Sequence, residues 1–118
     1  MRIPKGIRYD YKIRVLKPNE TAPEDVTGWS GTFKIYYAPT GQVVLTSTIR
    51  TVSGEEKDGQ MYGYISGSDT DDIELILGMD ADNNYSLCDH SGFMSMGRSG
   101  ASTANVEIDR ITFYEAGA

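Results

Sequence analysis

The stretch TFKIYYAPTGQVVLTSTIRTV, residues 32–52, decides the fold class. Its first seven residues place Phe33, Ile35 and Tyr37 in one phase of a period-two pattern, which is the signature of a half-buried β-strand. A Pro-Thr-Gly turn follows, in which proline pre-sets φ and glycine is free to adopt a positive φ. Residues 42–52 then return as a second strand. The stretch therefore predicts a β-hairpin.

The same alternation occurs in three other segments. In Tyr9–Lys17, aromatic and aliphatic residues alternate with charged ones. In Met61–Ser66, the two tyrosines lie in the opposite phase to methionine and isoleucine. In Asn105–Glu115, the apolar phase changes near Asp109, which indicates either a β-bulge or a strand buried on both faces. Each segment is predicted to be a strand.

Shorter segments complete the expected architecture. Tyr85–Asp89 and Phe93–Met96 are predicted to be short strands, and Arg98–Ala104 a loop. Asp71–Leu77 fits either a short helix, capped by Ser68 or Thr70, or an extended strand, because it is too short for periodicity to decide. Six to eight strands separated by turns predict an all-β fold, a single antiparallel β-sandwich of the Ig-like or jelly-roll-like kind.

Length and composition narrow the function classes. The chain has 118 residues, the size of one domain, and 39% of them are hydrophobic. No apolar run approaches the roughly 18 residues of a membrane span, and no secretory signal is visible, so we expect no membrane partner. The net charge of −6 argues against a general nucleic-acid binder, because such proteins need a basic surface.

The charge is distributed unevenly along the chain. Residues 1–17 contain six basic residues and one acidic residue, whereas the remainder contains five basic and sixteen acidic residues. We therefore expect residues 1–8 to form a basic N-terminal arm attached to a β-sandwich domain, residues 9–118. A basic arm on an acidic body indicates contact with an acidic surface, such as a neighbouring copy. The arm residues with this expected role are Arg2, Lys5 and Arg8.

Few residues could support catalysis or metal binding. Cys88 and His90 are the only cysteine and histidine, and their i, i+2 spacing would place them on one strand face, but nothing identifies an oxyanion site for a hydrolase. Asp80-Ala-Asp82-Asn-Asn84 begins like a calcium loop but lacks the glycine and glutamate that follow in an EF-hand, so a hydrogen-bonded turn is the alternative. We expect no enzyme activity, no cofactor and no metal.

The exposed aromatic residues are the more informative candidates. Trp29, Tyr36, Tyr62 and Tyr64 are expected on an outward sheet face. Aromatic side chains there would anchor a protein interface, stack on sugar rings, or pair across strands to cover the sheet. The sequence alone leaves these three alternatives open.

The order of segments over residues 9–89 carries a resemblance to a known family. A charged strand leads to the polar loop Pro18–Glu24, then to the corner Asp25-Val-Thr-Gly-Trp29, and then to the hairpin of residues 32–52. Later, Gly59–Ile65 and the Ser68-Asp-Thr and Tyr85-Ser-Leu segments continue the order. This arrangement resembles small β-sandwich modules of tailed-bacteriophage virions, such as the N-terminal modules of baseplate upper proteins.

The chain also departs from that pattern. The family usually has a glycine immediately before the tyrosine strand, where this chain has Asn83-Asn84, and Ser91–Ala104 has no counterpart. The closing segment Val106–Phe113 resembles the last strand of jelly-roll carbohydrate-binding modules. The first resemblance implies a virion structural protein, assembled in the host cytoplasm, whose partners are other virion proteins and copies of itself. The second implies a glycan partner.

Overall fold

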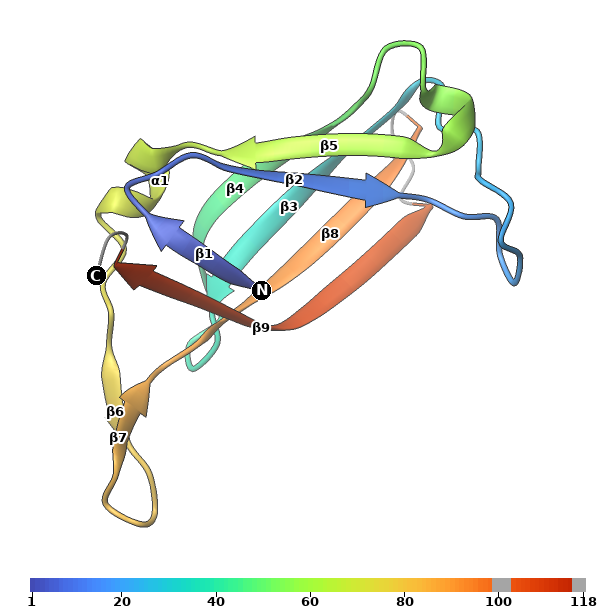
Figure 1. Cartoon of the computed structure of the whole chain (residues 1–118). Helices are drawn as coiled ribbons and strands as arrows, with labels where there is room; N and C mark the ends of the chain where they lie inside the picture. The colour runs from blue at the N-terminus through green and yellow to red at the C-terminus, as the bar shows by residue number, and fades with distance from the viewer. Residues whose placement is uncertain (99–102, 116–118) are drawn as a thin grey trace.

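Nine strands and one short helix are formed by the residues that the structure describes, 1–98 and 103–115 (Figure 1). The structure is a computed structural model. The strands are β1 (Arg2–Lys5), β2 (Tyr9–Arg14), β3 (Trp29–Tyr37), β4 (Gln42–Thr51), β5 (Gln60–Ile65), β6 (Leu77–Met79), β7 (Tyr85–Leu87), β8 (His90–Arg98) and β9 (Ala104–Glu115). The helix is α1 (Gly67–Asp71), and a 3-10 turn, η1 (Glu56–Asp58), lies in the β4–β5 connection.

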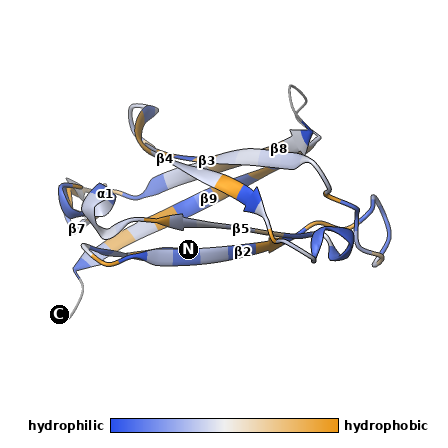
Figure 2. Ribbon diagram, turned by 90° about the horizontal axis from the view of Figure 1, so that it is seen from above, coloured by the Kyte–Doolittle hydropathy of each residue, from blue (hydrophilic) through white to orange (hydrophobic). Residues whose placement is uncertain are grey.

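Seven of these strands form one curved sheet in the order β1-β9-β8-β3-β4-β5-β2. Seen from above, β3, β4 and β8 form one layer and β2 and β5 lie opposite them (Figure 2). The fold class is therefore all-β, as predicted. The expected antiparallel sandwich needs correction, because the two layers belong to a single, nearly closed sheet and because β1 pairs with β9 in parallel. β6 and β7 form a separate two-stranded sheet.

The N-terminal residues belong to this sheet. Arg2–Lys5 pair with residues 112–115 of β9, and Ile3 is fully buried. Pro4 is compatible with this position because β1 is an edge strand, where a missing N–H breaks no ladder. The prediction of a separate arm at residues 1–8 is wrong over β1, because one buried isoleucine and the parallel partner fix this segment to the domain.

The predicted hairpin and strands are present with small changes of length. The β3–β4 turn places Gly41 at φ 73°, and its N–H donates to the carbonyl of Tyr37 at 2.8 Å. β2 ends at Arg14, three residues before the predicted end, and β7 ends at Leu87. The predicted strand Phe93–Met96 is part of the nine-residue β8. The predicted loop Arg98–Ala104 falls mostly on residues outside the described ranges.

The core fills the space between the two layers. It is built from alternate residues of strands in the large sheet, so the period-two alternation predicted for β2, β3 and β5 is confirmed. The fully buried large side chains are Phe33, Phe113, Ile3, Ile35, Ile49, Met61, Ile65, Met96, Ile111 and Val26. Phe33 packs edge-on against Tyr11, with ring centroids 5.4 Å apart.

The phase change in β9 is a register irregularity. Ile111 pairs with His90 and Ile108 pairs with Gly92, so three residue steps on β9 face two on β8. This extra residue turns Ile111 and Phe113 into the core, whereas Val106 stays exposed. The predicted bulge is confirmed, and it lies where β9 stops pairing with β8 and begins to pair with β1.

The short helix lies earlier in the chain than predicted. Ser66, rather than Ser68 or Thr70, is its N-cap and accepts a hydrogen bond from the N–H of Asp69. Thr70 is buried inside the helix, where its hydroxyl accepts from the N–H of Gly6 at 3.0 Å and donates to the carbonyl of Gly67. The helix thus ends at Asp71, and the chain continues in an extended form into β6.

Candidate interaction surfaces

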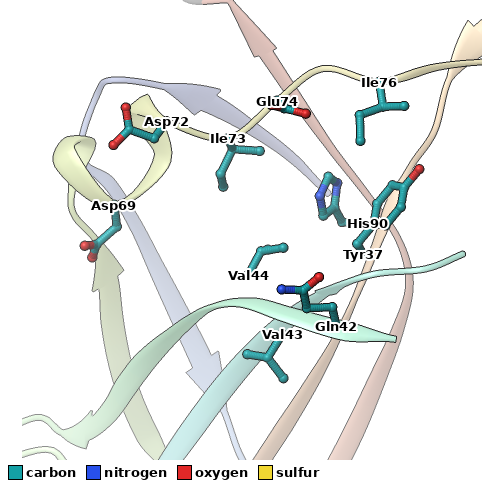
Figure 3. Close-up of a pocket in the computed structure, with 10 residues that line it drawn as sticks. All are labelled: Tyr37, Gln42, Val43, Val44, Asp69, Asp72, Ile73, Glu74, Ile76 and His90. Atoms are coloured by element: carbon teal, nitrogen blue, oxygen red, sulfur yellow. The ribbon is translucent and has the colours of Figure 1, made fainter. Parts of the chain in front are cut away.

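A cavity of about 380 Å³ lies at the base of the β6–β7 hairpin (Figure 3). Its floor and walls come from the start of β4, the end of β3 and the segment between α1 and β6. Both apolar and acidic residues line it. The apolar residues are Val43, Val44, Ile73 and Ile76, and the acidic residues are Asp69, Asp72 and Glu74. Tyr37, Gln42 and His90 complete it. The cavity therefore has an apolar part and an acidic rim.

His90 in this cavity is a packed side chain. It is buried, and its ring lies edge-on to Phe113 at 4.9 Å and tilted to Tyr37 at 5.5 Å. Burial lowers the pKa of His90, although the nearby carboxylate of Asp89 opposes this shift. The surroundings of the imidazole therefore favour its neutral form.

Cys88 is not placed beside His90 on a strand. β7 ends at Leu87 and β8 begins at His90, so Cys88 and His90 do not belong to one strand. The expectation that residues two apart lie on the same face of a strand therefore does not apply to them. The backbone N–H of Cys88 donates to the carbonyl of Ile76 at 2.7 Å. Burial and the Cys88 thiol together raise the pKa of the Tyr37 hydroxyl, so the thiol faces a tyrosine. This arrangement offers no base aligned for a nucleophile.

The acidic segment at residues 80–84 forms a hydrogen-bonded turn. Oδ1 of Asp80 accepts the N–H groups of Asp82 at 2.9 Å and of Asn84 at 3.0 Å, which is the predicted alternative to a calcium loop. Over residues 1–98 and 103–115, no group of three or more histidine, cysteine, aspartate and glutamate side chains is placed to share a metal ion.

This turn joins β6 and β7 into a hairpin with one apolar face. Leu77 pairs with Leu87 and Met79 pairs with Tyr85, so all four side chains lie on the same side, because directly opposed residues share a face. Leu77, Met79 and Tyr85 are 60%, 54% and 64% exposed. The hairpin extends away from the curved sheet (Figure 1). We call these four residues the hairpin face.

A second surface lies on the outer side of β2 and β5. Lys12 and Arg50 are both in register with Tyr62, one from each neighbouring strand. Next to them, the guanidinium of Arg8 lies 4.0 Å above the ring of Tyr64 and forms an ion pair with Asp10. We call the surface formed by Arg8, Asp10, Lys12, Arg14, Arg50, Tyr62 and Tyr64 the basic tyrosine face.

A groove of about 370 Å³ lies beside Lys12 and Tyr62 of the basic tyrosine face. Its lining combines Tyr62 and the polar residues Lys12, Gln60, Asp10 and Glu55 with Tyr11, Val52, Met61 and Gly63. An aromatic surface beside several hydrogen-bonding groups is typical of a site that binds either a protein side chain or a small polar ligand.

The structure places the seven predicted partner residues in four different locations. Arg8, Tyr62 and Tyr64 come together on the basic tyrosine face. Arg2 and Lys5 lie instead on the β1–β9 edge, where Arg2 stacks on Tyr114 and Lys5 pairs with Glu115. These arm residues therefore have partners within their own chain.

The two remaining aromatic predictions have different outcomes. Tyr36 is half-buried on the outward side of β3. Trp29 is only 9% exposed and belongs to the core, so its expected role as an exposed anchor is wrong. The reason is local: hydrogen bonds from Thr27 to the carboxylate of Asp25 stabilise the corner and lower the pKa of Asp25, and β3 then begins at Trp29 with this ring inward.

The hairpin face was missed by the sequence analysis. A signal was present, because Leu77 and Met79 before the turn and Tyr85 and Leu87 after it alternate with small residues. Such alternation around a turn of acidic and amide residues predicts a hairpin with one apolar face.

A comparison with protein-family models and with curated protein sequences finds no match to this chain. None of the helices among the described residues has the length and apolar character needed to cross a bilayer.

Proposed function

We propose that this chain is a non-catalytic structural protein of a bacteriophage virion, which acts by assembling with copies of itself and with other virion proteins. The observation that carries this proposal is the exposed hairpin face. A two-stranded hairpin is marginally stable alone, and burial of its apolar face against a partner would stabilise it. Aromatic and methionine side chains are also enriched at protein interfaces.

The virion assignment rests on the resemblance of residues 9–89 to virion β-sandwich modules. The nearly closed all-β domain is compatible with it, since such a domain presents a stiff surface to neighbours. The test is mass spectrometry of purified particles from the phage that encodes the chain. We expect the chain in the particles at a fixed ratio to the other structural proteins. Its absence from particles, despite abundance in infected cells, would contradict the assignment.

Assembly itself is tested with the purified chain by light scattering over a range of concentrations. We expect the mean mass to rise with concentration for the native chain. The double variant Leu77→Ser/Tyr85→Ser should remain monomeric. The matched control is Val106→Ser, which removes another exposed apolar side chain outside the hairpin face and should associate as the native chain does. Circular dichroism establishes that all three chains are folded.

A carbohydrate-binding module is the second candidate, and the groove beside Tyr62 supports it. Tyr62 would stack on a sugar ring while Gln60, Asp10 and Glu55 bind its hydroxyl groups. A glycan array tests this directly. Specific binding by the native chain that Tyr62→Ala abolishes and Tyr36→Ala retains would favour this function over assembly.

A further inference from the structure

The hairpin face lies in a strongly acidic part of the chain. Residues 58–97 contain eight aspartate and glutamate residues and no lysine or arginine. Asp80 and Asp82 lie in the turn at the tip of the hairpin, and Asp72 and Glu74 line the cavity at its base. The hairpin face is therefore an apolar surface with acidic residues at both of its ends.

The basic tyrosine face has the complementary character. It carries four cationic side chains, of which Arg8 is already paired with Asp10. Lys12 and Arg50 are in register on either side of Tyr62, and Arg14 is exposed on the same side of β2. Tyrosine and arginine are among the residues that most often provide the binding energy of an interface.

The two surfaces are too differently placed to meet within one molecule. In Figure 1 the hairpin points away from the sheet, whereas β2 and β5 lie on the opposite side. A contact between them is therefore possible only between two copies. A symmetric contact of hairpin with hairpin is disfavoured, because it would bring two acidic segments together.

We propose that the hairpin face of one copy docks on the basic tyrosine face of the next copy, with Leu77 and Tyr85 against Tyr62 and the acidic turn beside Lys12 and Arg50. This deepens the proposed function by naming the partner and both surfaces. The contact is heterologous, since the two surfaces differ, so repeated use closes a ring or extends a filament.

The experiment mixes two variants, each of which lacks one surface. Leu77→Ser/Tyr85→Ser removes the hairpin face, and Lys12→Glu/Arg50→Glu reverses the charges of the basic tyrosine face. All four positions are exposed or turned outward, so the fold is retained. Lys34→Glu, on the outward side of β3, is the charge-reversal control.

At a concentration where the native chain associates, each double variant alone should be monomeric by light scattering. Their equimolar mixture should form a dimer and grow no further, because only one functional pair of surfaces remains. Lys34→Glu should associate as the native chain does. Raising the salt concentration should weaken association at least about tenfold, since exposed charges are screened.

The outcomes separate this contact from the proposed function. If Leu77→Ser/Tyr85→Ser is monomeric while Lys12→Glu/Arg50→Glu associates normally, the docking proposed here is wrong and assembly through the hairpin stands. If both variants are monomeric and their mixture stays monomeric, the heterologous contact is likewise wrong. If the native chain is monomeric at every concentration, self-assembly and this contact fail together.

Discussion

The hydroxyl of Tyr11 on β2 lies 2.8 Å from Oγ of Ser47 on β4, inside the core. Ser47 donates its own proton to the carbonyl of Tyr64 on β5 at 2.7 Å, so Tyr11 is the donor to Ser47. These two consecutive hydrogen bonds connect β2, β4 and β5 where the sheet curves. Gly63 lies beside it, and any side chain there would collide with the ring and hydroxyl of Tyr11.

The two side chains that form these hydrogen bonds, Tyr11 and Ser47, should differ in their contribution to stability. Tyr11→Phe removes one hydrogen bond and should lower the free energy of unfolding by about 1 kcal/mol. Ser47→Ala leaves the buried Tyr11 hydroxyl without its acceptor and should cost about 1–3 kcal/mol. Chemical denaturation measures both. Adding Tyr11→Phe to Ser47→Ala should recover part of the loss, and a fully additive double variant would contradict the hydrogen bond between the two hydroxyls.

The N-terminal strand should contribute to folding. Ile3→Ala should lower the free energy of unfolding by about 2–5 kcal/mol, because a fully buried side chain would leave a cavity beside β9. The control is Arg2→Ala, which removes an exposed contact with Tyr114 and should cost about 0.5–1 kcal/mol. Equal losses in thermal denaturation would mean that residues 1–5 behave as a loose arm after all.

Trp29→Ala and Tyr36→Ala should lower stability by clearly different amounts in the same assay. Trp29→Ala should cost about 3–5 kcal/mol, since this ring is part of the core. Tyr36→Ala removes a half-buried outward ring and should cost about 1 kcal/mol or less. Similar midpoints for the two variants would contradict the inward placement of Trp29. The same result shows why Tyr62, and not Trp29, is the informative position for glycan or partner binding.

The sequence predicted those parts of the fold that depend on local alternation. The β3–β4 hairpin, β2, β5 and the bulge in β9 are all visible as period-two patterns in single segments. The inward position of Trp29 could have been predicted in the same way, because Trp29 is in phase with Phe33 and Ile35. It was misplaced only because the predicted strand began at Thr32 and not at Trp29.

The remaining elements depend on distant contacts. β1 is four residues long and contains proline, and its partner on β9 is more than 100 residues away along the chain. α1 has five residues, too few for a helical period, and its position depends on the bond between Thr70 and the N–H of Gly6. The basic tyrosine face could be predicted only in part, since the alternation of β5 places Tyr62 and Tyr64 outward but does not show that Arg50 lies beside Tyr62.

His90 should make the stability of the domain depend on pH. Burial lowers its pKa in the folded state below the usual value of about 6.5, so the unfolded chain binds more protons in the interval below that value. The stabilising contribution is therefore complete above about pH 6.5 and is lost as the pH falls toward the folded-state pKa. His90→Phe, which keeps an aromatic ring against Phe113, should abolish this part of the pH dependence.

Asp89→Asn should make the dependence of stability on pH steeper, because the carboxylate that favours the charged imidazole is gone. Free energies of unfolding between about pH 5 and 6.5 measure the slopes, an interval chosen because most carboxylates titrate below it. Equal slopes for the native chain and His90→Phe would show that the imidazole has the same pKa in the folded domain as in the unfolded chain, contrary to the effect expected from its burial against Tyr37 and Phe113.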